Sequence, residues 1–195
     1  MTICIYGGAF DPLHLGHESI IGYLATHDQV DQLLVVPSGI PVLKSSFMFS
    51  SDARLAMVRS VASQYGNVDV IDYEINKLSP SYMIETLQYL SIQYPGQSMN
   101  LVIGFDQFRS FHEWFGYADI LDMVQLWVIQ REGVDSDAVI ASLPTIMRQR
   151  LNQVVFHSYT PPVISSSMIR DSIDAGRDVS DFVSDPILHV LNDLN

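Results

Sequence analysis

The stretch YGGAFDPLHLGH at residues 6–17 decides which fold this chain is expected to adopt. It follows a short apolar run at 2–6 and precedes an amphipathic segment that begins near Leu15. This order predicts a strand, a glycine turn and a helix N-terminus. A helix start carries unpaired backbone N–H groups and the positive end of the peptide dipole, and glycines let an anion approach the main chain closely. The turn is therefore predicted to bind an anionic ligand.

Two histidines belong to the same turn. His14 and His17 are three residues apart, which puts them on one face of the first helical turn, and Gly16 between them removes a side chain from that face. The pair could also hold a metal ion, with Asp11 as a third ligand, but no carboxylate cluster completes such a site. We therefore favour the anion site and predict no protein-held metal.

Composition limits the classes of protein that the chain can represent. Its 195 residues, 48% hydrophobic and 16% charged, predict one globular domain over 1–195. A net charge of −12 argues against nucleic acid or an anionic membrane as a partner. Cys4 is the single cysteine, and no apolar run approaches about 18 residues. We expect a cytoplasmic protein; its oligomeric state stays open, a homo-oligomer included.

Apolar runs alternate with segments of helical spacing along the whole chain. Strands are predicted at 2–6, 32–37, 67–71, 99–103, 124–129 and 154–156. Helices are predicted at 15–27, from Ser50 or Ser51 to 65, at 81–94, as short pieces in 107–121, at 136–151 with a kink or a break at Pro144, at 165–175 and after Pro186. The alternation predicts a Rossmann-like, doubly wound α/β fold, with a parallel sheet and helices on both faces.

Polar and glycine-rich segments follow several of these strands. In doubly wound sheets, ligands bind at the carboxyl ends of the strands. The segments with this placement are 7–8, 38–44, the turn 104–106, and 165–170 at the start of a helix.

The segment ISSSMIR at 164–170 predicts a second anion site. Serines at a helix start cap free N–H groups, and Arg170 lies three or four residues further on, over the same face. Hydroxyls, backbone donors and a guanidinium suit phosphate oxygens. Two such sites fit a triphosphate better than a single phosphate.

These two segments resemble the GG-x-F-D-P-x-H-x-G-H and I-S-S-T-x-I-R motifs of the nucleotidyltransferase superfamily, in particular the bacterial nicotinate-nucleotide adenylyltransferases. The resemblance implies an enzyme that transfers the adenylyl group of ATP to the phosphate of nicotinate mononucleotide, giving deamido-NAD and pyrophosphate. It implies Mg²⁺, held mainly by the ATP phosphates because the chain shows no dedicated carboxylate cluster.

The resemblance also assigns residues to ATP. His14, His17 and Arg170 are implied as catalytic, because they contact the phosphates and the charge that develops at the α-phosphorus. A cationic histidine suits this task. The wider set implied for ATP is Gly7, Gly8, Ala9, Phe10, His14, His17, Gly104, Asp106, Arg131, Ile164, Ser165, Ser166, Ser167 and Arg170.

The acceptor side carries more departures from the family pattern. By resemblance, the acceptor is bound by Lys44, Ser81, Tyr82, Met83 and Trp114. Leu43, Met83 and Phe105 depart from the residues usual in the family. By the same resemblance Trp114 is expected to stack on the pyridine ring, whereas Phe111 and Phe115 are expected to be packing residues.

Other functions stay open at this point. Pantetheine-phosphate adenylyltransferase shares the fold and the chemistry, although that family typically carries threonine where this chain has His14. Nicotinamide mononucleotide is an alternative acceptor. A nucleotide-binding regulatory protein without turnover is a further alternative, suggested by the altered acceptor motifs.

Overall fold

The computed structural model describes residues 1–40, 47–130 and 136–193. The chain forms two compact units. Unit 1 comprises Met1–Tyr6 and Tyr82–Thr160, and unit 2 comprises Gly7–Ser81 and Pro161–Asn195. The expectation of a single domain over 1–195 stays a prediction.

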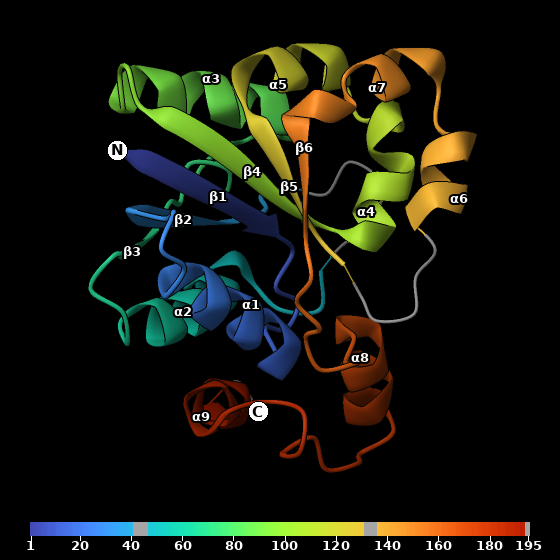
Figure 1. The fold of residues 1–195 in the computed structure, drawn as a ribbon. Helices are drawn as coiled ribbons and strands as arrows, with labels where there is room; N and C mark the ends of the chain where they lie inside the picture. The colour runs from blue at the N-terminus through green and yellow to red at the C-terminus, as the bar shows by residue number, and fades with distance from the viewer. Residues whose placement is uncertain (41–46, 131–135, 194–195) are drawn as a thin grey trace. The chain divides into compact units, whose positions relative to one another are not determined.

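Six strands make one parallel sheet, in the order β3-β2-β1-β4-β5-β6 (Figure 1). Their bounds are β1 Thr2–Gly8, β2 Gln32–Pro37, β3 Val68–Val70, β4 Ser98–Gly104, β5 Gln125–Ile129 and β6 Val154–His157. This is the strand order of the Rossmann fold, with its reversal between β1 and β4. The predicted α/β class with an all-parallel sheet is confirmed, and each predicted strand is present.

Unit 1 contains β4, β5 and β6 together with several short helices. They are α3 Met83–Gln93, α4 Phe105–Ser110, the 3₁₀ turn η1 Phe111–Glu113, α5 Tyr117–Met123, α6 Ser136–Ser142, α7 Thr145–Gln149 and η2 Leu151–Gln153. Helices α3 and α5 lie side by side (Figure 1). The predicted break at Pro144 is confirmed, because this residue lies between α6 and α7.

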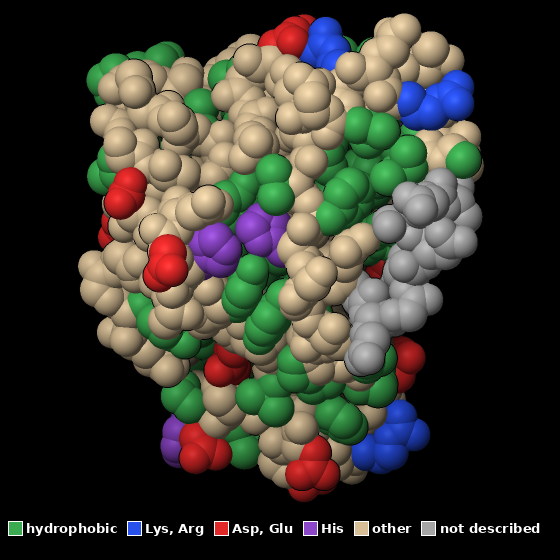
Figure 2. All heavy atoms as spheres, viewed as in Figure 1, with side chains coloured by type: hydrophobic (Ala, Val, Ile, Leu, Met, Phe, Trp, Pro, Cys, Tyr) green, Lys and Arg blue, Asp and Glu red, His purple; other side chains and the backbone are tan. Residues whose placement is uncertain are grey.

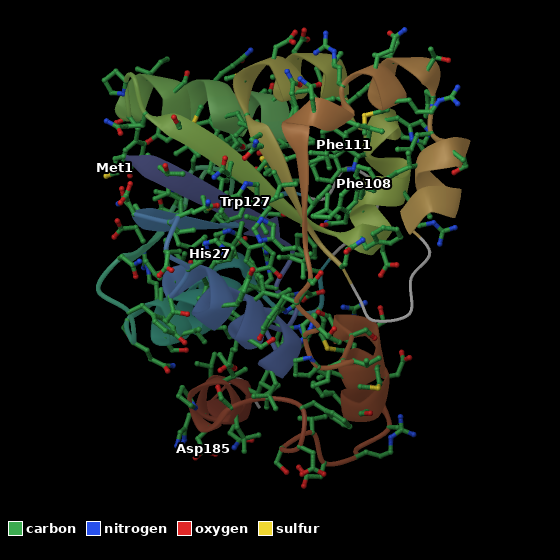
Figure 3. The ribbon with its side chains drawn as sticks, viewed as in Figure 1. Met1, His27, Phe108, Phe111, Trp127 and Asp185 are labelled. Carbon is green, nitrogen blue, oxygen red and sulfur yellow. The ribbon has the colours of Figure 1, made fainter. Side chains whose placement is uncertain are left out.

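Aromatic residues fill the interior of unit 1. Phe108, Phe111 and Trp127, labelled in Figure 3, are at most 2% exposed. Phe108 meets Phe156 edge to face at 5.3 Å between ring centroids, and the rings of Trp127 and His157 are 4.2 Å apart. Such pairs combine large apolar burial with favourable ring geometry.

The structure corrects the sequence prediction after β4. Residues 104–106 were expected to form a turn, but only Gly104 is extended, and α4 begins at Phe105. The Gln107 side chain accepts a hydrogen bond from the Gly104 backbone N–H at 3.2 Å, which satisfies a donor at this helix start. Phe105 and Asp106 therefore belong to the first turn of a helix.

Unit 2 holds β2 and β3 together with α1 Leu15–Ala25, α2 Ser51–Ala62, α8 Ser166–Asp174 and α9 Asp185–Asp193. Leu33 to Pro37 are all buried along β2, as expected of a parallel strand covered on both faces. The Ser50 side chain caps α2 by accepting from the Ala53 N–H at 3.2 Å, as predicted. Helix α2 contacts β2, β3 and α9.

No helix in the described ranges is both long and apolar enough to cross a membrane. On the face drawn in Figure 2, lysine and arginine side chains are scattered and form no continuous basic patch. This distribution agrees with the acidic composition.

The turn after β2 depends on a close backbone approach. A Cβ atom added to Gly39 would lie 2.0 Å from the carbonyl oxygen of Glu74, which is less than any real contact allows. Gly39→Ala should therefore lower the free energy of unfolding by about 1–3 kcal/mol, since the backbone must shift. Urea denaturation measures this loss.

The matched control is Gly66→Ala. Gly66 has no neighbouring atom within 4 Å of an added Cβ, so its change should stay within about 0.5 kcal/mol. Equal effects of the two substitutions would contradict the steric argument.

Candidate nucleotide-binding site

The glycine turn after β1 is shaped by packing as well as by backbone freedom. Phe10 has a positive φ of 48° and a fully buried ring. A Cβ added to Gly8 would lie 2.9 Å from the tip of that ring. The sequence explained Gly8 by the approach of an anion, whereas the structure shows that the Phe10 ring already needs the missing side chain. Gly7 and Gly8 close β1 and are half-buried.

His14 caps the helix that follows. Its Nδ1 accepts a hydrogen bond from the Gly16 N–H at 3.2 Å, and its carbonyl oxygen accepts from the N–H groups of His17 and Glu18. Because Nδ1 accepts, a neutral His14 ring carries its proton on Nε2. A Cβ on Gly16 would lie 3.0 Å from the His14 ring and 3.1 Å from the Pro162 carbonyl oxygen, so a small residue is needed here too.

The two histidines are stacked on each other. Their ring centroids are 3.7 Å apart with 27° between the planes, and the Phe10 ring meets His17 edge to face at 5.1 Å. Burial lowers the pKa of His17 well below its usual value, and the neighbouring His14 lowers it further. In the folded chain these two effects favour the neutral form of His17, whereas the cationic form expected beside phosphates stays a prediction.

The three serines at the start of α8 have three different partners. Ser165 accepts from the Met168 N–H at 3.2 Å and caps the helix. Ser166 donates from its hydroxyl to the Pro12 carbonyl oxygen at 3.0 Å, and Ser167 accepts from Arg170 at 3.1 Å. Residues more than 150 positions apart are thus brought together, because Ser166 ties α8 to the turn after β1. Ile164, just before the cap, is half-buried.

Arg170 and Asp11 form the second link between the two motifs. Arg170 Nη1 donates to the Asp11 carbonyl oxygen at 2.6 Å and lies 3.6 Å from the Asp11 carboxylate. The Asp11 carboxylate also accepts from the N–H groups of Met48 at 3.1 Å and Phe49 at 2.9 Å. A buried carboxylate needs such partners. Asp11 is therefore engaged and is not a spare metal ligand.

The buried contacts of Asp11 and Arg54 were not predicted from the sequence. Arg54 is fully buried on α2, and it donates to the Ala9 carbonyl oxygen at 2.8 Å. One sequence signal could have revealed it: Arg54, Val58 and Val61 have the i, i+4, i+7 spacing of a buried helix face. A charged residue in an apolar stripe needs internal partners.

The candidate residues of unit 1 occupy helix starts. Gly104 precedes α4, and Asp106 is exposed in its first turn. Met83 is the first residue of α3, and the Tyr82 N–H donates to the Glu85 carboxylate at 3.3 Å. The backbone N–H groups of this first turn suit a carboxylate ligand.

Two aromatic predictions near η1 have different outcomes. Phe111 is fully buried, as expected of a packing residue, whereas Phe115 is 65% exposed and packs only at the surface. The Phe115 ring lies 4.8 Å from that of Tyr82. Trp114 is half-buried against Phe111, with 5.2 Å between ring centroids. Phe115 is exposed because it follows η1 where the chain turns toward α5.

Three residues discussed from the sequence belong to segments outside the described ranges. Lys44, Leu43 and Arg131 lie outside the described residues. Ser81 is also a candidate residue of unit 2. Its hydroxyl is shielded from solvent and has no hydrogen-bond partner among the residues that the structure describes. Across those same residues, no group of three or more His, Cys, Asp or Glu side chains is placed to hold a metal ion.

The folded arrangement joins a glycine turn, a stacked histidine pair and a serine-capped helix with an arginine, which is the chemistry of a phosphate site. Residues 5–172 match the model of the cytidylyltransferase-like family. The chain therefore belongs to this family of nucleotidyltransferases, and the predicted superfamily is confirmed.

Named relatives show which members of this family the chain resembles. A protein of Nitratiruptor sp. named as a probable nicotinate-nucleotide adenylyltransferase is 30% identical over 173 residues, which cover 87% of this chain and 98% of the relative. A protein of Flavobacterium johnsoniae with the same name is 31% identical over 183 residues, covering 92% of this chain and 90% of the relative. This chain is similar to nicotinate-nucleotide adenylyltransferases over nearly its whole length.

Solved structures show the same fold. The Plasmodium falciparum nicotinic acid mononucleotide adenylyltransferase complexed with NaAD has a TM-score of 0.76 at 18% identity, covering all of this chain and 96% of its own. The same enzyme complexed with APC has a TM-score of 0.72 at 16% identity, with the same coverage.

The lowered pKa of His17 predicts a pH dependence of stability. The unfolded chain binds a proton near pH 6.5, whereas folded His17 binds it only at lower pH. The contribution of neutral His17 to the free energy of unfolding is thus complete above pH 6.5, and it is lost as the pH falls toward the pKa of His17 in the folded chain. His17→Gln should flatten the fall in unfolding free energy between pH 7 and pH 5.

Urea denaturation at several pH values measures this difference. The control is His189→Gln, on the exposed face of α9, which should leave the pH profile unchanged. A His17→Gln profile parallel to that of the native chain would contradict the lowered pKa of His17.

Proposed function

We propose that this chain transfers the adenylyl group of ATP to the phosphate of nicotinate mononucleotide, giving deamido-NAD and pyrophosphate. Family membership and the names of its relatives support the reaction class. The observation that carries the proposal is the junction of the two motifs in unit 2, where Ser166 and Arg170 both contact the 11–12 segment.

The triphosphate is bound by this junction. Helix α1 and helix α8 both begin there, so their first N–H groups and positive dipole ends favour phosphate oxygens. His14, His17 and Arg170 contact the phosphates. The segments 7–10 and 164–167 supply the remaining donors, and Gly104, Asp106 and Arg131 contact the rest of ATP.

Arg170 changes partner when ATP binds. In the structure its Nη1 donates to the Asp11 carbonyl oxygen, a neutral acceptor. A phosphate oxygen is a charged acceptor and makes a stronger hydrogen bond with a guanidinium. Asp11 thus holds the guanidinium at the edge of the site before the nucleotide arrives.

The reaction is an in-line displacement at the α-phosphorus. An oxygen of the acceptor phosphate forms the new bond to this atom, the bond to the bridging oxygen of the β-phosphate breaks, and pyrophosphate leaves with the electron pair. The negative charge of the triphosphate raises the pKa of His17, so this residue takes up a proton and stabilises the developing charge.

The acceptor is bound by Lys44, Ser81, Tyr82, Met83 and Trp114. The backbone at Met83, the first residue of α3, offers N–H groups to the nicotinate carboxylate. Trp114 stacks on the cationic pyridine ring, because its indole face is negative.

Mg²⁺ accompanies ATP in this proposal. The described residues do not fit a dedicated magnesium cage, since Asp11 is engaged by two N–H groups and by Arg170. Mg²⁺ is therefore held mainly by the substrate phosphates. A cytoplasmic location, expected from the sequence, remains a prediction.

An acceptor panel tests the function. The protein is incubated with ATP and Mg²⁺ plus nicotinate mononucleotide, nicotinamide mononucleotide or phosphopantetheine, and pyrophosphate is measured. We expect the highest kcat/KM with nicotinate mononucleotide. Release only with phosphopantetheine would contradict the proposed substrate, and ATP binding without release from any acceptor would indicate a regulatory protein.

His17 tests the catalytic assignment. His17→Ala should lower kcat by on the order of 10²-fold, because a donor to the transition state is lost. Its melting temperature should fall by only a few degrees, since the His17 residue is half-buried. Steady-state kinetics and thermal denaturation measure the two effects, with His189→Ala as the matched control. Near-native turnover of His17→Ala would remove His17 from the catalytic set.

A further inference from the structure

Arg54 is a fully buried cation beneath the turn after β1. Its side chain is 0% exposed, and the Phe47 ring covers the guanidinium at 4.1 Å from the ring centroid. Burial lowers the pKa of Arg54, while the carboxylate of Asp11 raises it. A guanidinium stays charged in proteins, so unit 2 keeps a positive charge in its interior.

A single nitrogen of Arg54 joins two turns. Nη1 donates to the Ala9 carbonyl oxygen at 2.8 Å and to the Ser38 carbonyl oxygen at 2.7 Å. Ala9 belongs to the turn after β1, and Ser38 follows β2. A backbone bond from the Ser38 N–H to the Gly8 carbonyl oxygen, at 2.8 Å, ties the same turns.

These bonds fix the orientation of two peptide groups. In a trans peptide the C=O and the following N–H point in opposite directions. Because the carbonyl groups of Ala9 and Ser38 point toward Arg54, the N–H groups of Phe10 and Gly39 point away from it. The Phe10 peptide lies in the glycine turn that the proposed function assigns to ATP phosphates.

Asp11 connects Arg54 to the other cation of the site. Its carboxylate interacts electrostatically with Arg54 and lies 3.6 Å from Arg170. It also accepts from the main chain of Met48 and Phe49, immediately after Phe47. The Asp11 carboxylate, in the turn after β1, therefore interacts with two cations, Arg54 and Arg170.

We propose that Arg54 is a positioning residue for nucleotide binding, which holds the turns after β1 and β2 so that their backbone N–H groups face the triphosphate. This inference rests on the proposed function for its ligand. Arg54 touches neither the substrate nor the reacting atoms, and it acts through the peptide groups of Ala9 and Ser38.

Arg54→Lys tests the proposal. Lysine keeps the charge, but its shorter side chain lacks the planar fork that places Nη1 between the two carbonyl oxygens. We expect the Kd of ATP to rise about tenfold and the Kd of adenosine to change less than twofold, as measured by calorimetry on the full chain. If Arg54 only stabilised the fold, the substitution would weaken the binding of ATP and of adenosine to the same extent, because only the folded fraction would change.

Arg59→Lys is the matched control. Arg59 lies on the same helix, is exposed and pairs with Asp72 at 3.5 Å, so its replacement should leave both Kd values unchanged. Equal effects of Arg54→Lys on ATP and adenosine, or an unchanged Kd for ATP, would overturn the positioning role.

Phe47→Leu provides a milder variant if Arg54→Lys does not fold. It removes the ring over the guanidinium, and the Kd of ATP should rise about threefold with that of adenosine unchanged. An unchanged Kd for ATP would overturn the proposal.

ATP binding and turnover, both measured on the native chain, distinguish the failure of the proposed function from the failure of this inference. Binding of ATP without turnover overturns the proposed function and still tests Arg54 through the Kd values. No ATP binding by the native chain overturns both.

Discussion

The turn between β1 and α1 keeps its shape because Asp11 satisfies several groups at once. Its carboxylate accepts two main-chain N–H groups from 48–49, and its carbonyl oxygen accepts from Arg170. A carboxylate that is only 2% exposed would be costly without these partners. The same contacts bring the start of α8 to the start of α1, so satisfying one buried charge joins the two segments that the proposed function assigns to phosphate.

Several residues at this turn have a structural and a functional task together. His14 caps α1 through Nδ1, and the proposed function also assigns this residue to the ATP phosphates. Ser166 ties α8 to the Pro12 carbonyl oxygen, and Ser165 caps that helix. Because such groups are already oriented by internal hydrogen bonds, the proposed nucleotide would need little ordering of the chain when it binds.

The protonation of His17 illustrates how the ligand alters the site. Sequence reasoning considered the histidine together with its phosphates and predicted a cation. The folded chain alone buries the ring beside His14, so the neutral form is favoured. Phosphate reverses this balance in the proposed function, because its negative charge compensates the cost of the protonated ring.

The sequence by itself determined the strand and helix order, the parallel α/β class and the two phosphate motifs, because apolar periodicity, glycine turns and serine caps act over a few residues. The tertiary structure alone decided which distant groups meet. Asp11 and Arg170, 159 positions apart, are joined by packing. The burial of Arg54, the exposure of Phe115 and the start of α4 at Phe105 likewise depend on neighbours remote in sequence. Local patterns specify elements, whereas burial and hydrogen-bond satisfaction are properties of the folded chain.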